Sequence, residues 1–148
     1  MTIDPINHPA HYAGIAAGIE CIDIARHLPF SIGNAVKYLW RAGKKDPAKT
    51  LEDLEKAEWY IWDYLDHRVV AADLFPAAAA VFALLPIQDI AEDLNDCRWS
   101  IIGSIIRGDF MLAKTSLVAW IREEKEIAAA AGDAAGAIGL SIAGEVKP

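Results

Sequence analysis

Apolar residues recur at helical spacing along most of this chain, and no segment alternates apolar and polar residues as a β-strand does. A chain with this pattern buries one stripe of each helix against other helices. We therefore predict an all-α fold, a compact bundle of five or six helices preceded by an extended N-terminal loop. The expected core positions of the two best-marked helices are Val36, Leu39, Trp40, Leu51, Leu54, Ile61 and Leu65.

Prolines, glycines and capping residues indicate where the first helices begin and end. Residues 19–27 are expected to form a short helix, which Pro29 ends. Ser31 is the predicted N-cap of the next helix. That helix should run through Ala42 and stop at Gly43, because glycine is the residue most often found just past a helix C-terminus.

The later helices are marked in the same way. Asp46 and Pro47 read as an N-cap and a first-turn proline, beginning a helix that continues to about His67. A break is expected over 69–73. The helices predicted after it are an apolar helix ending at Leu85, a helix from Pro86 to Ile106, and a last helix that begins at Phe110 after a turn at Gly108 and Asp109.

The length and composition suit a folded protein of ordinary size. The chain has 148 residues, and a hydrophobic content of 54% is ample for a buried core. We divide it into a first helical domain over 1–70, a helical C-terminal extension packed on it over 71–131, and a flexible tail over 132–148. The tail is expected because 128–144 is rich in Ala and Gly and lacks dense apolar periodicity.

Net charge and apolar content exclude some function classes. The formal net charge is −7, which disfavours a duplex nucleic acid as partner. The longest apolar stretch, 74–87, is too short to span a bilayer and contains two prolines, so no membrane association is expected. Cys21 and Cys97 are far apart and indicate neither a zinc site nor a disulfide framework. A cytoplasmic location is the simplest reading.

A basic cluster reverses the acidic character of the chain within a short segment. Asn34, Lys37 and Arg41 are spaced three and four residues apart, so their side chains project from one stripe of a helix. Lys44 and Lys45 follow at the end of that stripe. Guanidinium and ammonium groups suit phosphate oxygens, and the Asn amide can bond to a base or a sugar hydroxyl. We predict that this cluster binds the phosphates of a small anionic ligand.

The basic cluster also has a purely structural reading. Its charges could form a solvated helix face that pairs with Glu52, Glu55 or Glu58 of the next helix. It is not a P-loop, because the segment 41–45 lacks both the upstream glycine and the Ser or Thr that would hold magnesium. Phosphate chemistry here would depend on side-chain clamps, positioning and charge neutralisation.

Two further clusters carry possible chemistry. His8 and His11 stand three apart in a proline-containing loop, where they could contact a ligand, move a proton or bind a metal; otherwise they serve capping or packing. Acidic residues at helical spacing could hold magnesium, as in the all-α nucleotide pyrophosphohydrolases of the MazG type, or form a solvated face. These acidic residues are Glu52, Asp53, Glu55, Glu58, Asp89, Glu92, Asp93 and Asp96.

Four ordered motifs over residues 6 to about 64 resemble a small bacteriophage family known as SaV-like or phage nucleotide kinase, a domain of unknown function. They are Asn7-His8-Pro9-x-His11-Tyr12, Ile19-Glu20-x-Ile22-Asp23, Gly33-Asn34-Ala35-x-Lys37-Tyr38-x-x-Arg41-x-Gly43-x-Lys45 and Glu52-Asp53-Leu54-x-Lys56-Ala57-x-Trp59-Tyr60. The resemblance implies phosphorylation of deoxynucleoside monophosphates without a P-loop. The C-terminal half matches no family that we can name.

For the residues of these motifs and for Lys44 we state a set of roles, which are our own hypothesis. His8, His11 and Arg41 would be catalytic, and the nucleotide or its phosphates would contact Tyr12, Asn34, Lys37, Arg41, Lys44 and Lys45. Glu20 and Asp23 would orient a histidine or hold magnesium. ATP would be the phosphate donor and Mg²⁺ would accompany it. The expected setting is the cytoplasm, that of the host cell if a phage encodes the chain, and a homo-oligomer is expected from the apolar C-terminal helices and from Trp59 and Trp62.

The alternatives are a different enzyme class and a binding protein. A MazG-like nucleoside triphosphate pyrophosphohydrolase requires Glu52, Glu55 and Glu92 to converge on magnesium. A non-catalytic protein would bind a nucleotide without turnover, or engage a host protein through its aromatic surface.

Overall fold

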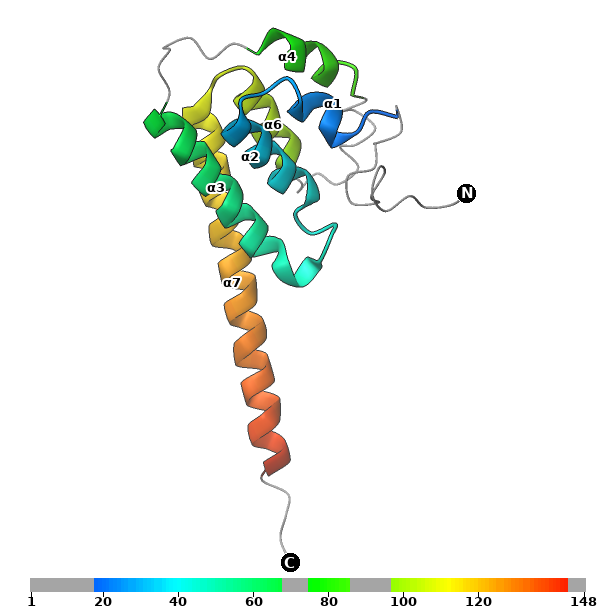
Figure 1. Ribbon diagram of the computed structural model, residues 1–148. Coiled ribbons are helices and arrows are strands. Elements are labelled where there is room, and N and C mark those ends of the chain that lie inside the picture. Colours follow the sequence, from blue (N-terminus) through cyan, green and yellow to red (C-terminus); the bar gives the residue numbers. More distant parts are fainter. Residues whose placement is uncertain (1–17, 68–74, 86–96, 144–148) are drawn as a thin grey trace, which may run out of the picture.

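A computed structural model describes residues 18–67, 75–85 and 97–143, with side chains described as far as residue 133. The described residues form helices and connecting turns, without a strand (Figure 1). This confirms the all-α fold. The helices are α1 (Cys21–Ala25), α2 (Phe30–Arg41), α3 (Thr50–His67), α4 (Pro76–Phe82), α6 (Arg98–Ile106) and α7 (Phe110–Ala143). The extended loop expected at the N-terminus lies outside the described residues.

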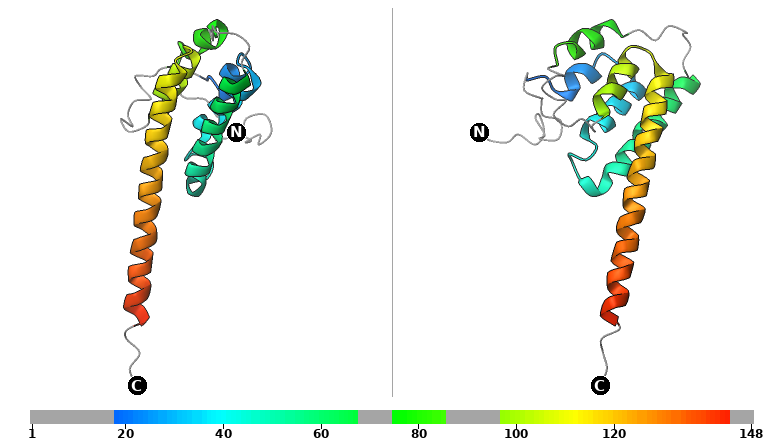
Figure 2. Two further views of the ribbon diagram at one scale, coloured as in Figure 1. Left: turned by 90° about the vertical axis from the view of Figure 1, so that its left-hand side faces the viewer. Right: turned by 180° about the vertical axis from the view of Figure 1, so that it is seen from behind.

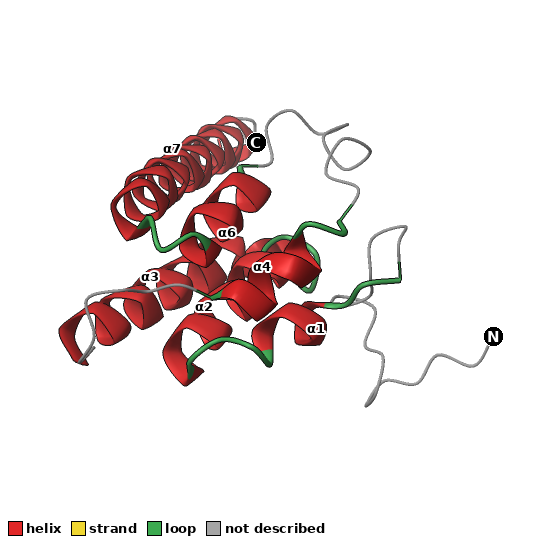
Figure 3. Ribbon diagram, turned by 90° about the horizontal axis from the view of Figure 1, so that it is seen from above, coloured by secondary structure: helices red, strands yellow, loops and turns green. Residues whose placement is uncertain are grey.

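Helix α2 lies at the centre of the bundle and packs against α1, α3 and α6, as the view from above shows (Figure 3). Its predicted core residues Val36, Leu39 and Trp40 are fully buried. The opposite stripe of the helix carries Asn34, Lys37 and Arg41. The helical period of the sequence therefore places the apolar stripe inward and the basic stripe outward.

The N-terminus of α2 differs from the prediction. The helix begins at Phe30 after Pro29, so Ser31 is not the N-cap. Ser31 instead donates a hydrogen bond of 2.5 Å to Asp63 Oδ2 on α3. The capping preference of serine is outweighed here by a tertiary partner, while Pro29 has no N–H and suits the position before a helix. The C-terminus follows the prediction: Gly43 has φ +74°, which glycine adopts without strain.

Gly33, the first glycine of the same motif, lies where α2 approaches α1 closely. A Cβ atom at this position would lie 3.1 Å from the carbonyl oxygen of Ala25, in the last turn of α1. This contact is tighter than an ordinary Cβ contact, so a side chain at this position would push the backbones of α1 and α2 apart by a few tenths of an ångström. Gly33 therefore fixes the position of α1 against the start of the basic stripe.

Asp46 is a cap residue as predicted, but it caps a 3₁₀ turn, and helix α3 itself begins later than expected, at Thr50. The Asp46 side chain accepts a hydrogen bond of 3.1 Å from Ala48 N, and Pro47 opens a 3₁₀ turn that leads into the helix. Leu54 and Ile61 are buried, whereas Leu51 and Leu65 are only partly buried. The helix is described as far as His67, the last residue of this described range.

The C-terminal helices join the same core. Helix α6 is buried nearly all round, with Ile101, Ile102 and Ile105 at zero exposure. It packs on α2, α4 and α7, and α7 packs on α3. A helix from Pro86 to Ile106 was expected; the structure describes its last part as α6, and residues 86–96 lie outside the described part. Helix α7 begins at Phe110 as predicted, where the Asp109 side chain accepts a hydrogen bond from Leu112 N at 3.0 Å.

Helix α7 is much longer than we expected. It has 34 residues, which corresponds to about 50 Å, and its second half extends beyond the rest of the bundle (Figures 1 and 2). Residues 132–143, which we assigned to a flexible tail, are helical. The segment follows the alanine run 128–131 and holds four more alanines, and alanine is the strongest helix former. No helix among the described residues has the length and apolarity to cross a membrane.

Candidate anion-binding site

The site is built around the ring of Tyr38, on the outer side of α2. Three cations lie close to this ring: Arg41 Cζ at 4.5 Å, Lys37 Nζ at 4.8 Å and Lys56 Nζ at 5.7 Å from its centroid. The first two come from α2 and the third from α3. Cations over an aromatic face are stabilised by its quadrupole, so the ring holds three like charges near each other.

Lys37 is held in place by its neighbour one turn back. Its Nζ donates a hydrogen bond of 2.8 Å to Asn34 Oδ1, and Asn34 Nδ2 donates one of 2.8 Å to the carbonyl oxygen of Phe30. Partial burial lowers the pKa of Lys37, and the nearby Arg41 charge lowers it further. A bound anion would counteract both effects on the pKa, because a nearby negative charge favours the charged form of the ammonium group.

Arg41 is engaged by a carboxylate of the next helix. Its Nη2 donates to Asp53 Oδ1 at 2.6 Å and its Nε donates to Asp53 Oδ2 at 3.1 Å. The Arg41 side chain is 14% exposed and that of Asp53 is 6% exposed. The packing of α2 on α3 largely buries the pair, so Arg41 is not part of a solvated helix face. The alternative interpretation of the basic cluster had its charges pair with Glu52, Glu55 or Glu58 of the next helix. A carboxylate of that helix does pair with Arg41, but it is Asp53.

Two further lysines follow the end of α2. The backbone N–H groups of Lys44 and Lys45 both donate to the carbonyl oxygen of Arg41, at 2.9 and 3.1 Å, which closes the turn around Gly43. Lys44 Nζ lies 5.4 Å from the ring centroid of Trp99, and both lysines are exposed. The turn therefore extends the positive potential of α2 beyond its last residue. We call Lys37, Arg41, Lys44 and Lys45 the basic face.

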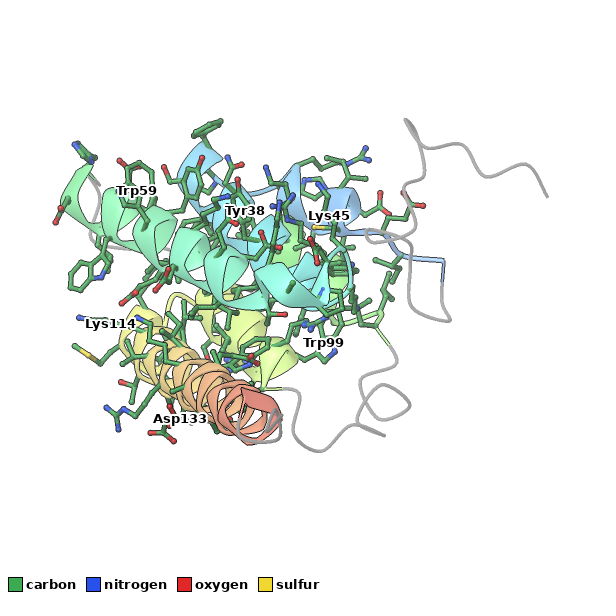
Figure 4. All side chains as sticks on the ribbon, turned by 90° about the horizontal axis from the view of Figure 1, so that it is seen from below. Tyr38, Lys45, Trp59, Trp99, Lys114 and Asp133 are labelled. Carbon is green, nitrogen blue, oxygen red and sulfur yellow. The ribbon has the colours of Figure 1, made fainter. Side chains whose placement is uncertain are left out.

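An aromatic group adjoins the basic face. Tyr60 of α3 stacks on Tyr38 with centroids 5.7 Å apart and an interplanar angle of 18°. Phe30 and Trp59 meet the Tyr60 ring edge-on, at 6.3 and 5.0 Å. Seen from below, Tyr38, Lys45 and Trp59 lie on the side of the molecule away from α7 (Figure 4). Cationic and aromatic surface thus share one side of the fold.

The proposed metal ligands have a structural role. Glu20 and Asp23 form a capping box at the N-terminus of α1, in which the Glu20 N–H donates to Asp23 Oδ2 at 2.9 Å. Asp23 also pairs with Arg26 at 3.1 Å. In the described ranges, no group of His, Cys, Asp and Glu residues is arranged to hold a metal ion. His8, His11 and Tyr12 lie outside the described residues.

The acidic cluster of α3 is divided among different partners. Glu52 forms an ion pair with Lys56 on its own helix, and this hydrogen bond lowers the pKa of Glu52 and raises that of Lys56. Glu55 pairs with Lys125 of α7 at 2.9 Å. The second acidic group of the hydrolase reading, residues 89–96, lies outside the described part of the chain.

Sequence reasoning missed a buried arginine that supports the site. Arg98 of α6 donates hydrogen bonds to the carbonyl oxygens of Trp40 and Ala42, at 3.0 and 2.8 Å. It therefore satisfies carbonyls at the C-terminal end of α2, where a positive charge also complements the helix dipole. No local sequence signal identifies this contact, because the residues are more than fifty positions apart.

Fold and site together define an all-α protein with an exposed cationic and aromatic face. Residues 6–62 match a sequence family described as a protein of unknown function (DUF3310). The match covers the basic face and most of α3, and it ends before α4. No curated protein and no solved structure matches the chain. The resemblance in the N-terminal part is therefore confirmed at the level of a family of unknown function.

Proposed function

We propose that the basic face binds the phosphate groups of a nucleotide, and that the protein phosphorylates deoxynucleoside monophosphates at the expense of ATP. The observation that carries the proposal is the position of Lys37. Its ammonium group is held by Asn34, lies beside Arg41, and is partly removed from water without a described carboxylate partner of its own. A bound anion would stabilise such a partly desolvated charge by electrostatic attraction and hydrogen bonding.

The proposed reaction is a simple exchange of one bond for another. An oxygen of the monophosphate attacks the γ-phosphorus of ATP, a P–O bond forms there, and the bond to the ADP oxygen breaks. The products are a deoxynucleoside diphosphate and ADP. The protein would supply positioning and positive charge, which are the main catalytic contributions in phosphoryl transfer.

Magnesium enters this proposal as part of the substrate. The ion would arrive bound to ATP. Arg41 would act mainly as a positioning residue, because its ion pair with Asp53 holds α2 against α3. Its charge would also add to the positive electrostatic potential beside Lys37. Because free nucleotides are found in the cytoplasm, this activity fits a cytoplasmic protein. If a phage or prophage encodes the chain, the activity would serve phage DNA synthesis.

Phosphorus NMR with ATP, magnesium and deoxynucleoside monophosphates tests the proposal. The informative variant is Lys37→Gln, because Arg41→Ala would also leave Asp53 buried without its partner. The matched control is Lys114→Gln on α7, where the ammonium lies over Trp62 at 3.7 Å and far along the chain from α2.

We expect deoxynucleoside diphosphates and ADP from the wild type and from the control, and loss of both from Lys37→Gln with an unchanged helical circular dichroism spectrum. Pyrophosphate release would instead establish the hydrolase. Tight nucleotide binding without any turnover would identify a binding protein. Equal activity in Lys37→Gln would remove the basic face from the reaction.

A further inference from the structure

Phe30 is the most exposed large apolar side chain among the described residues, at 79% exposure. It occupies the first position of α2, and its ring makes a T-shaped contact with that of Tyr60. Most of the Phe30 side chain is nevertheless open to solvent. Burial in the core does not explain a phenylalanine here. Phe30 and the exposed Trp59 both contact Tyr60, and a contiguous exposed apolar patch marks a ligand or partner site, whereas a single exposed residue does not.

Phe30 belongs to the same stripe as the basic face. Residues 30, 34, 37 and 41 are spaced four, three and four apart, which aligns them along one side of α2. Asn34 joins the two ends of this stripe, because its amide group donates to the Phe30 carbonyl oxygen and its oxygen accepts from Lys37. The Cα atoms of Phe30 and Lys37 are separated by about 10 Å along the helix axis.

A ligand on this stripe would meet an open aromatic ring at one end and cations at the other. A nucleotide has this division, with a flat base at one end and phosphates at the other, and bases stack favourably on exposed aromatic rings. Inorganic phosphate or a sugar phosphate would use only the cationic end.

We propose that Phe30 is the base-stacking residue of the site, so that the ligand class is a nucleoside phosphate and not a phosphate ester in general. This inference rests on the proposed function of the basic face. It assigns the selectivity for nucleotides over other phosphate compounds to a residue outside the basic face. The Asn34 amide, between the two ends, lies where the sugar would pass.

Calorimetric titration separates the two ends of the site. The ligands are a deoxynucleoside monophosphate, deoxyribose 5-phosphate and inorganic pyrophosphate, and the variants are Phe30→Ala, Phe30→Trp and Lys37→Gln. Met111→Ala is the matched control, because this residue is 76% exposed at the start of α7. The exposure of Phe30 predicts that its removal leaves the fold intact, which circular dichroism checks.

We expect Phe30→Ala to weaken nucleotide binding about ten-fold or more, with pyrophosphate and deoxyribose 5-phosphate unaffected. Phe30→Trp should retain the preference for the nucleotide, and Met111→Ala should behave as the wild type. Unchanged nucleotide affinity in Phe30→Ala, or an equal loss for all three ligands, would overturn the assignment.

The failure of the underlying proposal has a different signature. If the wild type binds none of the three ligands, or if Lys37→Gln leaves pyrophosphate binding intact, the basic face is not a phosphate site, and the role of Phe30 is overturned with it. Loss of pyrophosphate binding in Lys37→Gln together with normal nucleotide binding in Phe30→Ala overturns only the role of Phe30.

Discussion

Arg41 and Asp53 form a two-bond ion pair that joins α2 to α3, with donor–acceptor distances of 2.6 and 3.1 Å. Both side chains are largely buried, and Arg41 lies beside Lys37 and Tyr38 at the same time. The residue that best matched a phosphate clamp in the sequence therefore also holds the two helices of the site together. A loss of function on changing Arg41 cannot be interpreted without a measurement of stability.

We predict that Asp53→Ala or Arg41→Met lowers the free energy of unfolding by about 3–5 kcal/mol, because each change leaves one buried charge without its partner. The double variant Arg41→Met with Asp53→Ala should lose clearly less than the sum of the two single losses. Urea denaturation followed by circular dichroism measures all three. Strictly additive losses would show that the two charges do not stabilise each other.

Arg98 should be as important for the C-terminal end of α2. Replacing it with methionine removes two charged donors from the carbonyl oxygens of Trp40 and Ala42. We expect a loss of about 3 kcal/mol in the free energy of unfolding, and a smaller loss for Arg98→Lys, which retains the charge but not the planar geometry. Thermal denaturation compares the variants. A loss under about 1 kcal/mol for Arg98→Met would refute this capping role.

The affinity for pyrophosphate should depend on the protonation of Lys37. The pKa of Lys37 in the unliganded protein is lowered, first by burial and then by Arg41, and a bound anion should raise it. Well below that pKa the ammonium is fully charged and contributes no pH dependence. As the pH rises through it, binding must take up a proton and the affinity falls.

Titrations from about pH 7 to about pH 10 measure this dependence. Lys37→Arg is the control, because the guanidinium stays charged throughout this range and should keep the affinity at the alkaline end. A parallel decline in the wild type and in Lys37→Arg would assign the dependence to another group.

The two thiols should react at very different rates. Burial raises the pKa of Cys21 to about 12, although the charges of Lys37 and Lys44 act in the opposite direction. Cys97 is partly exposed. With a disulfide reagent at mildly alkaline pH, we expect Cys97 to be modified in the native protein and Cys21 only after denaturation. Rapid modification of Cys21 in the native state, tested with Cys97→Ser, would show that α1 opens readily.

The sequence indicated most of the local structure correctly. The helical period identified Val36, Leu39 and Trp40 as core residues. Glycine and turn signals indicated Gly43 just beyond the end of α2 and Phe110 as the start of α7. These features depend on residues a few positions apart, so local propensity and spacing determine them. Ser31 was misassigned because its hydroxyl group bonds to Asp63, thirty-two positions away.

The basic stripe itself was also determined by the sequence, since spacings of three and four residues place Asn34, Lys37 and Arg41 on one side of any helix that contains them. Only the tertiary structure decided how these residues are used. It pairs Arg41 with Asp53, leaves the Lys37 ammonium near the surface, and brings Arg98 to the end of α2. The physical reason is that periodicity fixes the direction of a side chain relative to its own helix, whereas its partners depend on the packing of helices distant in sequence.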